Sequence, residues 1–245
     1  MPSTQGPRPG GPRRGEMVAL LDWDNTLHEG WTLDPWVRYL VEEGVAPPSF
    51  GRDTQRAVDD YLGDRIDHSE LGHRVGALYA AVAGGWRTSD VADLAVPFLA
   101  GVERRVFPFV PALLSWLVDR GIEPVIVTGA PADLVVGYVE PAGGRVVGLT
   151  LAESDGRYTG AVRRNPVTAD EKARVVAELE ADGHQVVLGA GDTDSDLPLL
   201  RAARRQLVVG NPALAAEFPT TAMLVDPRTA TGDEVCRGLE RLLGV

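Results

Sequence analysis

Two aspartates, Asp22 and Asp24, follow a short apolar run and are separated by a single residue. In an extended backbone, side chains two residues apart point to the same side. Two carboxylates held that close raise each other's pKa unless a cation lies between them. Mg²⁺ prefers oxygen ligands and would remove this repulsion. The spacing therefore indicates a divalent-cation site, with a solvated turn, where Asp and Asn are common, as the alternative.

A second acidic group follows a later apolar run and comprises Asp192, Asp194 and Asp196. One of these acids could serve only as the N-cap of the next helix, and Asp196 before Leu197-Pro198 suits that role. Three caps are not needed. Because the carboxyl ends of parallel strands lie along one edge of a sheet, this group would converge with the first pair of aspartates. Convergence favours a cation site over two independent turns.

Groups that could bind a phosphate occupy similar positions. Thr128 and Gly129 end another apolar run and supply a hydroxyl and an approachable backbone N–H. Lys172, in the first turns of a predicted helix, can supply a point charge. It is the only lysine among 24 basic residues, which suggests either chance or a role that arginine cannot fill. Taken singly, Thr128 could satisfy a strand-end carbonyl and Lys172 could be solvated. The order Asp, Thr, Lys, Asp along the chain favours the joint interpretation.

Short apolar runs alternate with helical patterns after residue 16. Buried strands are predicted where the runs are short and end in Gly, Thr, Asp or Asn, at 17–22, 124–129, 185–192 and 206–211. Helices are predicted at 111–121, 169–183, 197–203 and 232–244. Asp155-Gly156 within alternating residues predicts a hairpin over 149–162. This alternation predicts an α/β fold, a Rossmann-like parallel sheet with helices on both faces.

A long insertion separates the first predicted strand from the second. Residues 30–105 contain helical patterns, such as 34–44 and 52–65, and no clear strand, so we expect a helical cap subdomain there. The catalytic core would then comprise 17–29 and 106–245. Residues 1–16 are rich in Pro, Gly and Arg without apolar periodicity, which predicts a disordered N-terminal extension.

The composition narrows the range of partners. The 245-residue chain carries a formal net charge of −11, so its surface should repel nucleic acid and anionic membranes. No apolar run approaches the roughly 20 residues that a membrane span requires. The single cysteine, Cys236, cannot form an internal disulfide, which fits a reducing compartment and excludes a cysteine-based zinc cluster. We therefore expect a cytoplasmic protein.

Four motifs in this order resemble the haloacid dehalogenase-like (HAD) superfamily, particularly its phosphoserine-phosphatase-like branch. They are Asp22-x-Asp24-x-Thr26, Val127-Thr128-Gly129, Lys172 and Gly191-Asp192-x-x-x-Asp196. The resemblance covers about residues 17–245, with the cap matched only in position. The predicted hairpin ahead of the helix that carries Lys172 also looks like that branch.

The resemblance implies a role for each acid. Asp22 would be the nucleophile that attacks phosphorus and forms an aspartyl-phosphate. Asp24 would protonate the leaving oxygen and then deprotonate the water that hydrolyses the intermediate. Mg²⁺ would be held by the Asp22 carboxylate, the Asp24 backbone carbonyl and Asp192.

The same resemblance implies how the phosphoryl group is held. Thr128, the Gly129 N–H and Lys172 would bind its oxygens, and all three are candidate substrate-binding residues. Asp196 would contact Lys172 and orient it without touching the substrate.

Two departures from the branch concern the substrate. Phosphoserine phosphatases carry a Glu shortly after the first motif, whereas here Glu29 lies two residues early and Trp31 stands at the matching distance. We expect Glu29 and Trp31 to be candidate substrate-binding residues, with packing in the cap core as the alternative for Trp31. An acid at position 24 argues against dehalogenation, because a halide leaves without a proton.

The expected function is Mg²⁺-dependent hydrolysis of a small phosphorylated metabolite, a phosphomonoester. Two alternatives stay open: phosphoryl transfer to a substrate hydroxyl, as in a phosphomutase on the same catalytic set, and a non-catalytic binding protein of the same fold. Among the four histidines, His28 adjoins the expected site, and we expect His68, His73 and His184 at the surface.

Overall fold

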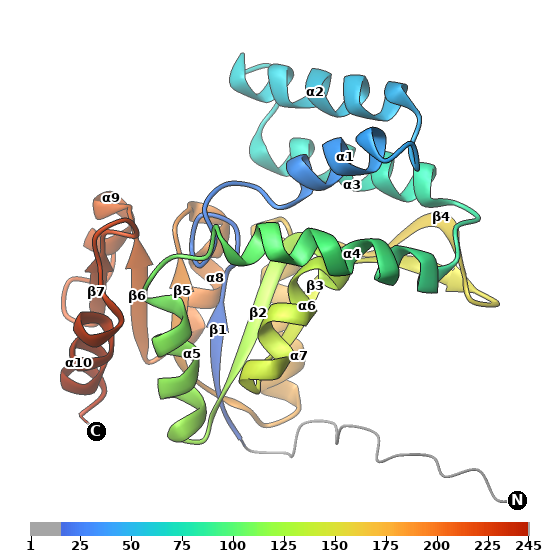
Figure 1. The fold of residues 1–245 in the computed structure, drawn as a ribbon. Helices are drawn as coiled ribbons and strands as arrows, with labels where there is room; N and C mark the ends of the chain where they lie inside the picture. The colour runs from blue at the N-terminus through green and yellow to red at the C-terminus, as the bar shows by residue number, and fades with distance from the viewer. Residues whose placement is uncertain (1–15, 245) are drawn as a thin grey trace, which may run out of the picture.

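A seven-stranded sheet forms the centre of the molecule (Figure 1). The structure, a computed structural model, describes residues 16–244, so the predicted disordered extension 1–16 lies outside it except for Glu16. The strand order is β4-β3-β2-β1-β5-β6-β7, with β4 antiparallel to β3 and the other neighbours parallel. The strands are β1 (Met17–Leu21), β2 (Ile122–Pro131), β3 (Arg145–Ser154), β4 (Arg157–Arg164), β5 (Gln185–Gly191), β6 (Arg205–Val209) and β7 (Ala222–Val225). The predicted α/β fold is confirmed.

The first strand, β1, lies in the middle of the sheet between β2 and β5. Its residues 18–21 are fully buried. Ala19 and Leu21 enter the core on one face of the sheet, and Val18 and Leu20 enter the core on the other face. A strand covered on both faces has to be continuously apolar, which explains why β1 shows no alternation in its sequence.

Helices cover both faces of the sheet, as predicted (Figure 1). One face carries α5 (Val110–Asp119), α6 (Ala132–Val139) and α10 (Gly232–Leu243), and the other carries α7 (Ala169–Ala181) and α8 (Leu197–Ala202). The short helix α9 (Pro212–Ala216) lies between β6 and β7 in the chain. The hydroxyl of Thr168 accepts a hydrogen bond from the Glu171 amide and fixes the start of α7, one turn before Lys172. Across the described residues, none of the helices combines the length and apolar character needed to cross a membrane.

The predicted hairpin is confirmed, and its two strands extend beyond the residues 149–162 that the sequence pattern indicated. Asp155 and Gly156 have positive φ angles of 52° and 73°, as a two-residue type I′ turn requires. β3 begins at Arg145, before the predicted start, because its first residues pair in parallel with β2. The hairpin therefore extends the sheet away from its parallel part.

Between β1 and α5, the chain forms four more helices: α1 (Leu33–Glu42), α2 (Pro48–Leu62), α3 (His68–Ala83) and α4 (Thr88–Glu103). The first three lie beyond the carboxyl end of β1, and α4 crosses back toward α5 (Figure 1). α3 packs against β4, and α4 packs against α6. Trp36, Tyr79 and Val91 share one apolar core with Leu149 and Tyr158 of the hairpin. The inserted helices are thus docked on the sheet through the hairpin and α6.

Two glycines let α3 lie directly against the segment that follows β4. A Cβ at Gly72 would lie 2.4 Å from Cγ2 of Val167, and a Cβ at Gly76 would lie 2.9 Å from Nδ2 of Asn165. The side-chain amide of Asn165 also donates a hydrogen bond to the Gly72 carbonyl at 3.2 Å. Any larger residue at these positions would push α3 away from the sheet.

We expect Gly72→Ala to be less stable than Gly51→Ala, a control in α2. Alanine gains about 1 kcal/mol of helix propensity over glycine at both positions. A Cβ at Gly51 meets nothing closer than 3.7 Å, so propensity should dominate there. At Gly72 the Cβ overlaps Val167, and overpacking costs about 1–3 kcal/mol. Urea unfolding measures the difference, and equal midpoints for the two variants would contradict the close approach.

Candidate active site

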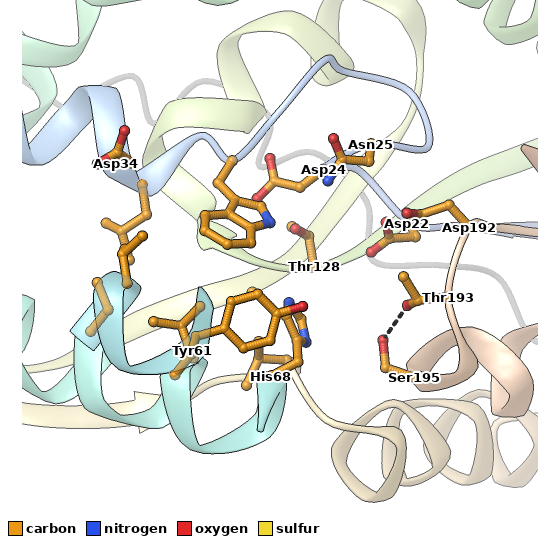
Figure 2. Close-up of a pocket in the computed structure, with 18 of the residues that line it drawn as sticks. Asp22, Asp24, Asn25, Asp34, Tyr61, His68, Thr128, Asp192, Thr193 and Ser195 are labelled. Atoms are coloured by element: carbon orange, nitrogen blue, oxygen red, sulfur yellow. Dashed lines mark hydrogen bonds between the residues drawn. The ribbon is translucent and has the colours of Figure 1, made fainter. Parts of the chain in front are cut away.

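The loop after β1 is held by its own backbone and side chains. One carbonyl, that of Trp23, accepts hydrogen bonds from three amides, those of Thr26, Leu27 and His28. Asn25 adopts a left-handed φ of 64°, which Asn tolerates better than most residues, and its side-chain oxygen accepts a hydrogen bond from the Gly30 amide. Figure 2 shows the result: Asp22 and Asp24 point toward the same cavity as Thr128 and Asp192.

Lys172 lies between two carboxylates. Its Nζ donates to Oδ1 of Asp22 at 2.7 Å and to Oδ1 of Asp196 at 2.5 Å, and all three side chains are buried. Burial alone would lower the pKa of Lys172, but the two carboxylates raise it above its ordinary value, so the lysine stays charged. Burial and the charge of Asp196 raise the pKa of Asp22 to about 6. One cation therefore faces two anions at this buried point.

Asp196 joins the loop after β5 to Lys172. Its Oδ2 accepts hydrogen bonds from the amides of Asp192 and Thr193, each at 3.0 Å, while its Oδ1 faces the lysine. The alternative that Asp196 only caps the next helix is wrong, because its side chain makes no capping bond to α8. A Cβ at Gly191 would lie 2.3 Å from the Asp196 Cβ, so glycine is required there.

Asp192 lies next to Asp22 on the same side of the cavity (Figure 2). Its Oδ1 accepts a hydrogen bond from the Thr26 hydroxyl at 3.0 Å, and its backbone carbonyl accepts one from Nδ2 of Asn211 at 2.9 Å. Burial, followed by the charges of Asp22 and Asp196, raises the pKa of Asp192 to about 8. Carboxylate oxygens of these three aspartates lie within 4.8 Å of one another. A divalent cation at this point would relieve their repulsion.

The residues present fit a Mg²⁺ ion. Both oxygens of Asp196 are engaged, one by Lys172 and the other by the loop amides, so Asp196 is not a candidate ligand. Asp22 and Asp192 each use Oδ1 for a hydrogen bond within the protein and offer a second carboxylate oxygen. Hard oxygen donors of this kind, supplemented by waters, are what Mg²⁺ binds.

Asp24 is positioned by Thr32, which nothing in the sequence had singled out. The amide and hydroxyl of Thr32 donate to Oδ1 of Asp24 at 3.0 and 2.6 Å, and the Trp23 indole donates to the Thr32 hydroxyl at 3.0 Å. Burial raises the pKa of Asp24 to about 7, against the opposing effect of the Thr32 hydrogen bonds. A carboxyl with such a pKa exchanges protons near neutral pH, as an acid–base group must. A Thr just before a helix usually signals an N-cap, but Thr32 makes no capping bond to α1.

Thr128 and Gly129 line the same cavity as Lys172. The sequence predicted a strand end there, but β2 continues to Pro131, and its pairing with β3 is irregular between Val127 and Pro131. Thr128 is 1% exposed, and its Oγ1 accepts a hydrogen bond from the Ala130 amide at 3.0 Å. A Cβ at Gly129 would lie 2.8 Å from Cγ2 of Val167. This stretch of β2 is therefore fixed from both sides, with little room for change.

The two substrate-contact candidates from the sequence lie in different surroundings. Trp31 lines the cavity and also packs against the apolar cluster of α2 and α3, so the packing interpretation holds and contact with substrate stays a prediction. Glu29 is not among the residues that line the cavity. The loop turns Glu29 to solvent, where its carboxylate lies 3.3 Å from Arg228.

The histidines follow the expectations only in part. His28 adjoins the site: it is buried, stacks on Trp23 and lies 3.8 Å from Oδ1 of Asp24, and burial lowers its pKa to about 4. His73 is exposed, as expected. His184 is buried, with its Nδ1 3.4 Å from the Glu16 carbonyl oxygen, so the surface prediction is wrong for this histidine. His68 is partly buried and lines the cavity together with Tyr61. Tyr61 and His68 meet only when α2 and α3 pack, a contact with no local sequence signal.

We expect Lys172→Met to lower the free energy of unfolding by about 3–5 kcal/mol, because the variant leaves buried carboxylates without their cation. Arg174→Met is the matched control: it removes one positive charge from an exposed position on the same helix and should change stability by less than about 0.5 kcal/mol. Denaturant unfolding of both variants measures the difference. Similar stabilities would mean that the lysine does not hold the site together.

The family model described as haloacid dehalogenase-like hydrolase matches residues 19–201. No curated protein matches the sequence significantly.

Several solved structures share the fold. A protein of unknown function from Bordetella pertussis Tohama I has 20% sequence identity and a TM-score of 0.70, covering 86% of this chain and 99% of its own. A phosphoserine phosphatase, solved as a phospho-aspartyl intermediate analogue, has 16% identity and a TM-score of 0.61, with 92% and 99% covered. Cytosolic 5′-nucleotidase IIIB bound to cytidine has 14% identity and a TM-score of 0.64, with 93% and 86% covered.

The family model spans β1, the inserted helices and the loop after β5, and so includes every strand end that meets at the site. Its extent, together with the shared fold, identifies the chain as a member of the haloacid dehalogenase-like hydrolase family.

Proposed function

We propose that this hydrolase is a Mg²⁺-dependent phosphatase that cleaves a small phosphomonoester through an aspartyl-phosphate on Asp22. The observation that carries the proposal is the buried Asp22 carboxylate held at 2.7 Å from Lys172, at the bottom of a cavity that Thr128 and Asp24 also line. A nucleophile, a phosphate-binding cation and an acid–base group thus share one site.

Two bond exchanges make up the proposed reaction. A carboxylate oxygen of Asp22 attacks phosphorus while the bond between phosphorus and the ester oxygen breaks, and Asp24 gives its proton to that leaving oxygen. Asp24 then takes a proton from water, whose oxygen attacks the phosphoryl group and frees Asp22. Phosphate leaves, and Asp24 is again protonated. The two hydrogen bonds from Thr32 hold the Asp24 carboxyl in place through both steps.

The remaining residues stabilise charge that moves onto the phosphoryl oxygens. Lys172, the Thr128 hydroxyl and the Gly129 amide are the donors on the cavity wall. Asp22, Asp192 and the Asp24 carbonyl would hold the Mg²⁺ ion, which supplies positive charge next to the phosphoryl group. Asp196 takes no part in bond exchange and keeps Lys172 oriented.

We further propose that residues 30–105 act as a cap over a catalytic core formed by 17–29 and 106–245. The cavity holds about 200 Å³, and residues of α2 and α3 line the side remote from the carboxylates. A cap in that position excludes water from the reaction and selects the leaving group. The single Cys236 supports a cytoplasmic location, where small phosphorylated metabolites are the expected substrates.

The neighbours named above support this proposal through their fold and their printed functions. One is a phosphoserine phosphatase described as a phospho-aspartyl intermediate analogue, and another is a 5′-nucleotidase. Within the family, Asp24 favours phosphoryl over halide chemistry, because an alkoxide needs a proton to leave.

Asp22→Asn should lower phosphate release from p-nitrophenyl phosphate by at least about 10³-fold, because the amide is a poor nucleophile. Asp194→Asn is the control: it removes the same charge from an exposed loop position that does not line the cavity and should keep activity. Both variants should unfold like the parent chain. Substantial turnover by Asp22→Asn would remove this residue as the nucleophile.

The parent chain is assayed alongside for the products of natural phosphomonoesters. Inorganic phosphate is the expected product. An isomerised ester without phosphate release would indicate a phosphomutase, and binding without turnover would indicate a binding protein.

Mg²⁺ should raise the unfolding temperature of the parent chain and not that of Asp192→Asn. At a concentration 100-fold above the dissociation constant, a bound ion stabilises the fold by about 2.7 kcal/mol. In EDTA, Asp192→Asn should be at least as stable as the parent, because it removes a carboxylate that Asp22 repels and keeps the hydrogen bond from Thr26. Calorimetric scans with and without Mg²⁺ test this, and an equal Mg²⁺ shift in both proteins would place the ion elsewhere.

A further inference from the structure

Three aromatic rings form a continuous surface on the cap side of the cavity. The ring centroid of Trp31 lies 5.8 Å from that of Tyr61 and 6.4 Å from that of His68, and the Tyr61 and His68 centroids are 5.9 Å apart. Figure 2 shows Tyr61 and His68 across the cavity from Asp22 and Asp192. Burial lowers the pKa of His68, so its ring is uncharged near neutral pH. The leaving group of a substrate bound at Asp22 would meet this surface.

The charged residues around the cavity are unevenly distributed. Lys172 is the only Lys or Arg among the described residues that line it, and two carboxylates already engage this lysine. The charged residue on the cap side is Asp34, in the first turn of α1. Asp34 pairs with Arg38 at 2.8 Å, but Arg38 does not line the cavity. A leaving group with a carboxylate or a second phosphate would find no free cation there.

One polar atom in the same wall has no partner. Thr54 is 2% exposed, lines the cavity, and makes no hydrogen bond through its Oγ1 within the described residues. Thr54, Val58 and Tyr61 follow one another at helical spacing and share one face of α2. A buried hydroxyl without a partner is costly, and a polar ligand group would satisfy it.

We propose that this surface is the leaving-group subsite for an alcohol that carries a cationic ammonium group. The substrate class, phosphate esters of amino alcohols, rests on the proposed function. Aromatic faces attract an ammonium ion through their negative π-faces, and desolvation in a cavity strengthens this attraction. Asp34 supplies the opposite charge, and the lone pairs of the Thr54 hydroxyl are available to the cation.

The experiment separates charge from shape with matched esters. Phosphocholine is compared with 3,3-dimethylbutyl phosphate, which replaces the nitrogen by carbon and keeps the shape, and with phosphoethanolamine and the anionic phosphoglycolate. We expect kcat/KM for both ammonium esters to exceed that for the neutral ester by about tenfold or more, and phosphoglycolate to be the poorest substrate. A neutral ester as good as phosphocholine, or a preference for phosphoglycolate, would overturn the proposal.

Two variants assign the preference to named residues. Asp34→Asn should lower the ratio of kcat/KM for phosphocholine to kcat/KM for the neutral ester by about tenfold. Asp53→Asn is the control, because Asp53 also pairs with a nearby arginine on a cap helix, Arg56 at 2.9 Å, but does not line the cavity. Trp31→Leu should also reduce the ratio of kcat/KM for the ammonium esters to kcat/KM for the neutral ester. If the ratio of kcat/KM for phosphocholine to kcat/KM for the neutral ester is unchanged in both Asp34→Asn and Trp31→Leu, the proposed subsite is refuted.

A binding measurement keeps this proposal separate from the proposed function. Calorimetry with the Asp22→Asn chain, Mg²⁺ and the same esters should give tighter binding of phosphocholine than of its neutral analogue. If the parent chain hydrolyses neither these esters nor p-nitrophenyl phosphate, the phosphatase proposal fails, and the calorimetric ratio still decides the subsite. If all esters are hydrolysed and bound alike, the phosphatase proposal stands and the ammonium subsite fails.

Discussion

The contact of one buried ammonium with two buried carboxylates determines how the rest of the site is built. Lys172 comes from α7, Asp22 from the end of β1 and Asp196 from the turn before α8. Charges at this depth are tolerated only when they are paired and hydrogen-bonded, so these three elements have to meet in one arrangement. Asp196 extends the constraint by binding the amides of the loop that carries Asp192. Contacts within the protein therefore hold these side chains in position without the help of a substrate.

The sequence predicted the residues that follow the central strands more fully than those of the segment inserted between β1 and α5. Asp22, Thr128 and Asp192 follow apolar runs, and parallel strands in one sheet bring such residues to one edge whatever the details of packing. Thr32, Tyr61 and His68 have no such rule. Thr32 belongs to the site because the loop after β1 folds back on itself, and the other two meet because α2 packs on α3. The same dependence on packing explains the error at His184, since nothing local distinguishes a solvated side chain from a buried one.

Val167 links the two halves of the cavity. It lies against Gly129, in β2 next to Thr128, and against Gly72, in α3, and neither glycine has room for a Cβ. Because a valine side chain is stiff, a movement of α3 is transmitted to this stretch of β2 rather than absorbed between them. This stretch of β2 and the helix α3 therefore share one steric contact, which ties the position of the proposed leaving-group wall to that of the proposed phosphoryl-binding residues.

The central position of β1 also has a consequence for how the chain folds. β1 is made first, yet its neighbours β2 and β5 begin at Ile122 and Gln185, so a fully apolar strand waits for partners far along the chain. Such long-range parallel pairing is slow to form and leaves strand edges exposed meanwhile. On the ribosome, the five helices between β1 and β2 emerge before either partner strand. The order of synthesis thus leaves the apolar β1 without both of its partner strands until residue 191 has been added.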